Sequence, residues 1–180
     1  ALRLLANWLR IAGDEPAATR YDGHAHQART SFNQRFWYED GGYLYDVVDC
    51  NGQNGTHDTS CRPNQIFAIS LDYPVLNQER WASTLTVVQK KLLTPLGLRS
   101  LAPDDPEYKP IYSGDLRSRD GAYHQGTVWA WLIGPFIDAW LQIHPDDKNG
   151  AREFLRVFPQ HLSDNGVGIP SNLLGKVFDL

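Results

Sequence analysis

Apolar residues recur every three or four positions along most of this chain, and this spacing constrains the fold more than any other feature. The clearest series is Tyr21, Ala25, Ala28, Phe32 and Phe36. Residues at these intervals share one face of an α-helix. Similar spacing predicts helices near residues 2–12, after 63, and over 81–92, 123–143 and 150–162. We therefore predict an all-α fold.

The longest predicted helix and the long connections between helices are the next features of interest. The run over 123–143 is apolar nearly all round, so we expect one deeply buried helix with a kink at Pro135. Strand signal is limited to a ribbon at 43–48. The connections at 38–62 and 94–122 are each more than about 20 residues long, and such long loops usually carry function.

Composition excludes several classes of protein. The 180 residues fit one domain or a piece of a larger one, and the absence of Met favours a piece. With 17 basic and 21 acidic residues, the net charge of −4 disfavours nucleic acid as a partner. No apolar run reaches the roughly 18 residues of a membrane span. The two cysteines, Cys50 and Cys61, fit unpaired thiols in a cytoplasmic protein. The six histidines lack metal-ligand spacing, so we predict neither a metal ion nor a cofactor.

Polar residues gather first at Asp58–Gln65, just before a predicted helix. Arg62, Asn64 and Gln65 carry forked or paired hydrogen-bonding groups that suit adjacent sugar hydroxyls. The alternative is a structural Asp58–Arg62 pair with helix capping.

A second group follows Gly97 and includes Arg99, Asp104, Asp105 and Tyr108. Carboxylates and aromatic rings on irregular backbone suit the hydroxyls and C–H faces of a sugar. A solvated acidic loop is the alternative.

The third group lies at 119–129 and includes Asp120, His124, Gln125 and Trp129. These residues would line a pocket at the entry to the buried helix. Alternatively, Asp120 caps that helix and His124 is a core histidine. We expect all three groups to converge around a single hollow of glucose size.

Several segments resemble a known family. RPNQIFAISL, LLTPLGLRSLAP, YSGDLRSRDGAYHQGTVWAWLIGPF and HLSDNGVG are similar to the bacterial glycogen-debranching enzymes, in their amylo-α-1,6-glucosidase domain. The similarity runs from residue 1 to about 168. It implies part of a glucoamylase-type (α/α)6 toroid, about half of its helices, with long loops at one end. It also implies hydrolysis of α-1,6-linked glucose at glycogen branch points.

The resemblance implies an inverting mechanism with one carboxylic acid and one carboxylate base. The family's acid lies in a Thr-Trp-Met-Asp segment, before the first residue of this chain. Its Glu base follows Gly166-Val167-Gly168, where this chain has Asn172, and residues 169–180 form a tail that departs from the family pattern. An Asn cannot accept a proton from water at neutral pH. We therefore expect the chain to supply substrate-binding walls, with Asp120 as an alternative catalytic acid.

The predicted ligand is an α-glucan, bound by Arg62, Asn64, Gln65, Arg99, Asp120, His124, Gln125 and Trp129. Half a toroid would leave apolar faces open, so the remainder of a parent polypeptide or a second copy is the expected partner. Three alternatives remain open. They are a non-catalytic glucan-binding fragment, a sugar epimerase in which His124 moves a proton, and an inert helical fragment.

Overall fold

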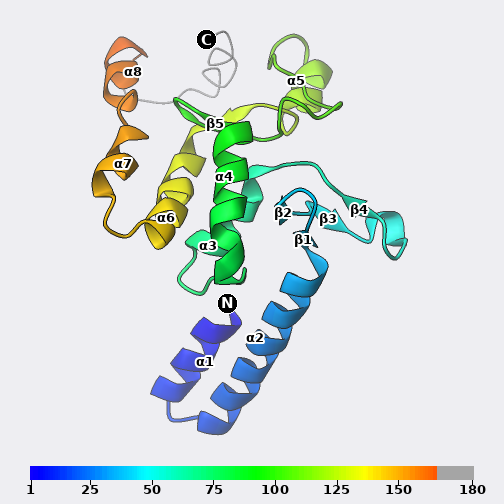
Figure 1. The fold of residues 1–180 in the computed structure, drawn as a ribbon, viewed down its shortest axis with the longest axis vertical. Helices are drawn as coiled ribbons and strands as arrows, with labels where there is room; N and C mark the ends of the chain where they lie inside the picture. The colour runs from blue at the N-terminus through cyan, green and yellow to red at the C-terminus, as the bar shows by residue number, and fades with distance from the viewer. Residues whose placement is uncertain (166–180) are drawn as a thin grey trace.

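The computed structural model describes residues 1–165, and most of them are helical (Figure 1). Helices α1 (Leu2–Ile11) and α2 (Glu15–Arg35) form an antiparallel hairpin that projects from the rest of the molecule. Gly13 ends the first helix with a φ of +85°, which L-residues rarely adopt. Asp14 then caps α2 by accepting a hydrogen bond from the Ala17 amide at 3.0 Å.

The core lies among α3 (Phe67–Ser70), α4 (Trp81–Leu92) and α6 (Ile133–Ile143), with α7 (Lys148–Glu153) beside α6. Helix α8 (Phe158–Asn165) ends the described part of the chain. The largest side chains of the core are fully buried, and they include Ile66, Ile69, Leu92, Leu98 and Phe136. A one-turn 3-10 helix, η2 (Pro63–Ile66), leads into α3 and begins with the proline, as the sequence predicts.

Within residues 1–165, three small antiparallel sheets join the helices. Strand β1 (Trp37–Tyr38) pairs with β2 (Tyr43–Leu44), and β3 (Val47–Val48) pairs with β4 (His57–Asp58). The third sheet has the order β5 (Leu93–Thr94), β6 (Gly97–Arg99) and β7 (Val128–Trp129). Its register places Arg99 opposite Val128. This sheet brings the second and third polar groups of the sequence side by side.

The region 123–143 differs from the predicted single helix. Helix α5 (Leu116–Ala122) ends before it, β7 and the 3-10 turn η4 (Ala130–Leu132) occupy its first half, and α6 starts only at Ile133. The pairing of Val128 with Arg99 replaces helical hydrogen bonds there. Pro135 causes no kink because it lies in the first turn of α6, where a missing N–H costs nothing. The predicted helix over 150–162 is likewise divided, into α7 and α8.

The mostly helical architecture with small sheets confirms the predicted all-α class and is consistent with part of an α/α toroid. Within residues 1–165, we find no helix with the length and apolar character needed to cross a membrane.

Candidate functional site

The first and third polar groups of the sequence meet at one cavity of about 440 Å³. The second group reaches it only through Ser100, and its Asp104, Asp105 and Tyr108 are not among the lining residues. Arg62 and Asn64 reach it from the start of η2, Ser100 from the end of β6, and His124 and Trp129 from the segment after α5. Its other lining residues are Asp46, Pro63, Tyr123, Trp131 and Leu132. The expected convergence of Arg62, His124 and Trp129 on a shared hollow is therefore observed.

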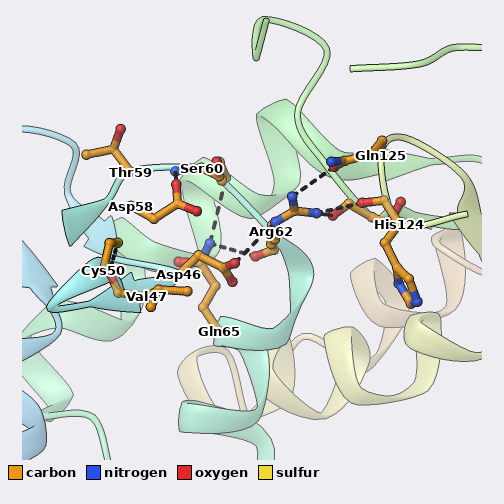
Figure 2. Close-up of polar contacts among 12 residues, drawn as sticks. Asp46, Val47, Cys50, Asp58, Thr59, Ser60, Arg62, Gln65, His124 and Gln125 are labelled. Carbon is orange, nitrogen blue, oxygen red and sulfur yellow. Dashed lines mark hydrogen bonds and ion pairs between the residues drawn. The ribbon is translucent and has the colours of Figure 1, made fainter. Parts of the chain in front are cut away.

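Arg62 fastens the walls of this cavity together (Figure 2). Its Nε lies 3.2 Å from Asp46 Oδ2, and its Nη2 donates to Gln125 Oε1 at 2.9 Å. Its Nη1 donates to the carbonyl oxygens of Ser100 at 3.2 Å and His124 at 2.6 Å. All three guanidinium nitrogens are thus committed to protein acceptors. Arg62 acts here as a clamp between three segments of the chain, and it also lines the cavity.

The ion-pair partner of this clamp also differs from the prediction. Asp58 accepts a hydrogen bond from the Ser60 amide at 2.8 Å, whereas Arg62 pairs with Asp46. On a helix, a spacing of four residues places two side chains next to each other. Asp58 lies in β4, and Arg62 has an extended backbone with φ −124° and ψ 156°. The local Asp58–Arg62 pair therefore does not form.

Asp46 is a site residue that the sequence analysis missed. It precedes β3 and its side chain is only 24% exposed. Burial raises the pKa of this carboxyl, while the nearby Arg62 guanidinium works in the opposite direction. Asp46 is the acid inside the otherwise aromatic and apolar run YLYDVV, and this position is the sequence feature that could have identified it.

Aromatic rings also line the cavity. The Tyr123 and Trp129 rings meet edge to face with centroids 4.7 Å apart, and the His124 ring packs against Tyr123 at 4.9 Å. Trp131 stacks on Phe67 at 6.1 Å and keeps 61% of its surface exposed. The lining of the cavity thus combines flat aromatic surfaces with a carboxylate and an amide.

Two amide residues predicted to bind substrate lie differently from each other. Asn64 is exposed at the cavity. Gln65 is 8% exposed, accepts from the Leu44 amide at 3.3 Å and donates to the Arg62 carbonyl at 2.9 Å. The Gln65 amide therefore holds β2 against η2, and it does not line this cavity. Gln125 lies behind the wall, bonded to Arg62.

Arg99 and Asp120 are not among the residues that line the cavity. Asp120 is exposed within α5, so it is neither the enclosed acid nor the helix cap that the sequence suggested. The buried helix α6 begins after Leu132 without a side-chain cap, whereas Asp115 caps α5 by accepting from the Ser118 amide at 2.8 Å. The predicted base position, Asn172, lies outside the described residues.

The acidic and histidine side chains of residues 1–165 do not form a group of three or more that could hold a metal ion. Cys50 is partly exposed and Cys61 buried, and both are free thiols.

Comparison with known proteins identifies the family to which the chain is similar. A model of the amylo-alpha-1,6-glucosidase family matches residues 1–178. The glycogen debranching enzyme of Saccharomyces cerevisiae is 33% identical over 106 residues, which cover 53% of this chain. The match spans only 7% of the length of that yeast protein.

Proposed function

The chain belongs to the amylo-alpha-1,6-glucosidase family, and we propose that the cavity around Arg62 binds glucose units of an α-glucan. The proposed reaction is the inverting hydrolysis of α-1,6-linked glucose at glycogen branch points, with this chain forming part of the substrate-binding wall. The observation that carries the proposal is the pairing of an aromatic wall with exposed polar groups in one cavity.

The chemistry of the lining supports a sugar ligand. Trp129, Tyr123 and the exposed Trp131 offer ring faces to the apolar C–H surface of a pyranose. Asn64 and Asp46 offer an amide and a carboxylate to its hydroxyl groups. A cavity of about 440 Å³ lies within the usual range for small-molecule sites.

The carboxylates favour a binding role over a complete catalytic centre. Acid–base hydrolysis needs two carboxyl groups on opposite sides of the scissile bond. Asp46 is the one carboxylate among the described residues that line the cavity, and it is paired with Arg62. We therefore propose that the two catalytic carboxylates lie outside the described residues, in a larger parent polypeptide. Free cysteines support a cytoplasmic location for that protein.

The test is isothermal titration of the chain with maltotriose and with a branched limit dextrin. The unaltered chain should bind both and release no glucose. Asn64→Ala removes an exposed amide and leaves the core intact, so it should weaken binding several-fold, by about 1 kcal/mol. Trp129→Ala should weaken binding by about 1–3 kcal/mol, since it removes an aromatic face.

Trp8→Ala is the matched control, because Trp8 is 60% exposed on α1 and does not line the cavity. It should bind as the unaltered chain does. Absence of binding to either glucan, or equal losses in the Trp8 and Trp129 variants, would reject the proposal. Glucose release by the chain itself would reject the assignment of a binding wall without the catalytic pair.

A further inference from the structure

A separate cavity of about 670 Å³ lies between α2 and the start of α4. Five of its lining residues come from one face of α2, at positions 26, 29, 30, 33 and 34. The others are Trp37, Glu39, Asn77 and Arg80. It shares no lining residue with the cavity around Arg62. Nothing in the proposed glucan chemistry uses this second site.

Basic side chains dominate the second cavity. Arg29, Arg80 and His26 line it, against Glu39 as the one carboxylate among its lining residues. That carboxylate already accepts a hydrogen bond from the Trp37 indole at 2.6 Å. The whole chain has a net charge of −4, so this local excess of cations is opposite to the average charge. A cavity of this kind attracts anions.

The structure fixes one of these cations in place. The guanidinium carbon of Arg80 lies 4.6 Å from the centre of the Trp37 ring, and its Nη1 donates to the Asn33 carbonyl at 2.6 Å. The Asn33 side chain in turn donates to the Val75 carbonyl at 2.7 Å and accepts from the Asn77 amide at 2.8 Å. This buried network ties the loop before α4 to α2. Arg80 is therefore held at the cavity before any ligand arrives.

Arg29 is the complementary group. Its guanidinium makes no hydrogen bond or ion pair with another residue in the described range, and it lies on the α2 face that lines the cavity. A planar guanidinium with free N–H groups matches two oxygens of a phosphate or carboxylate. The cavity therefore offers an anionic ligand two arginines: Arg80, whose position the protein fixes, and Arg29, whose N–H groups are uncommitted.

The rest of the lining suits a sugar. Thr30, Gln34 and Asn77 add a hydroxyl and two amide side chains, which hydrogen-bond to sugar hydroxyls. The volume is ample for more than a bare anion, because sites for small organic ligands begin at about 300 Å³. We propose that this cavity is a binding site for a phosphorylated monosaccharide, with Arg29 and Arg80 on the phosphate.

The proposal is tested by isothermal titration of the chain with glucose 6-phosphate, inorganic phosphate and glucose. Glucose 6-phosphate should bind at least about ten-fold more tightly than glucose, because hydrogen bonds to a charged group are the stronger ones. Inorganic phosphate should bind more weakly than glucose 6-phosphate, since it leaves the amides unused. Phosphate binding as tightly as the sugar phosphate would overturn the assignment of a sugar.

Arg29→Ala should weaken glucose 6-phosphate binding at least about ten-fold. Arg20→Ala is the matched control. Arg20 is also exposed on α2, lies 5.5 Å from the Tyr21 ring centre, and does not line the cavity. Equal losses in both variants would ascribe binding to net charge and overturn the proposal, as would equal affinities for glucose and its phosphate. Asn64→Ala should leave glucose 6-phosphate binding unchanged, which separates this site from the proposed glucan cavity.

Discussion

Arg62 and Arg29 each lie at a cavity, yet their guanidinium groups are used in opposite ways. Arg62 directs its three nitrogens to Asp46, Gln125 and two backbone carbonyls. Arg29 makes no such contact with any residue of the described range. An arginine whose three guanidinium nitrogens all contact the protein builds a wall, whereas an uncommitted one is free to recognise a ligand. Residue type alone does not separate the two roles.

The largest predicted effect is on stability. Removing the guanidinium of Arg62 should lower the free energy of unfolding far more than removing that of Arg29. Arg62→Ala leaves Asp46 partly buried without its cation and removes the donor to two carbonyls, so we expect the free energy of unfolding to fall by about 3 kcal/mol. Arg29→Ala should change it by less than about 0.5 kcal/mol, because the side chain is exposed. Urea denaturation at pH 7 measures both. Equal losses would remove the distinction between the two arginines.

Replacing each arginine by lysine should give a smaller contrast that tests geometry and not charge. Lysine keeps the positive charge but has one nitrogen, so Arg62→Lys cannot reach all three segments and should cost about 1–2 kcal/mol of stability. Arg29→Lys should leave stability unchanged and weaken glucose 6-phosphate binding by about five-fold. Paired denaturation and titration measurements follow the two effects. Full retention of function by both lysine variants would show that charge alone matters.

Local periodicity explains which parts of the fold were predictable. The spacing through Phe32 and Phe36 identifies α2, and Trp81 to Leu92 marks α4 with its correct ends. The strands β5, β6 and β7 have only two or three residues each, too few for an alternating pattern to show. Their pairing, which divides the predicted 123–143 helix, joins segments about 30 residues apart.

Contacts between segments that are distant in the sequence also limit what could be predicted of the two cavities. Arg62, His124 and Trp129 stand out in the sequence because polar groups crowd around each of them. Asp46 does not, since it lies alone in a strand-like run and meets Arg62 only through the tertiary fold. The second cavity, between α2 and the start of α4, brings residues of α2 together with Arg80. Arg80 lies more than 40 positions along the chain from most of the other lining residues.

The smallest predicted effect concerns the ionisation of Asp46. Burial raises the pKa of this carboxyl above its ordinary 3.8, against the opposing effect of Arg62. The folded protein therefore holds this proton to higher pH than the unfolded chain does. The contribution of protonated Asp46 to the free energy of unfolding is complete below pH 3.8, and it is lost as the pH rises through the raised pKa of Asp46.

Asp46→Asn lacks this titration, so the stability advantage of the unaltered chain over the variant should shrink as pH rises from below 3.8, and then become constant. Urea unfolding at intervals between about pH 3 and pH 7 measures the difference. Asp104→Asn is the control of opposite sign. The hydrogen bond from Lys91 lowers the pKa of Asp104, so its contribution is present above pH 3.8 and is lost as pH falls. Asp104 is 66% exposed, so the control effect should be small. If the Asp46 difference instead stays constant with pH, or grows as pH rises, the carboxylate at the clamp is not desolvated. The contrast between a committed and a free arginine would then rest on hydrogen bonds alone.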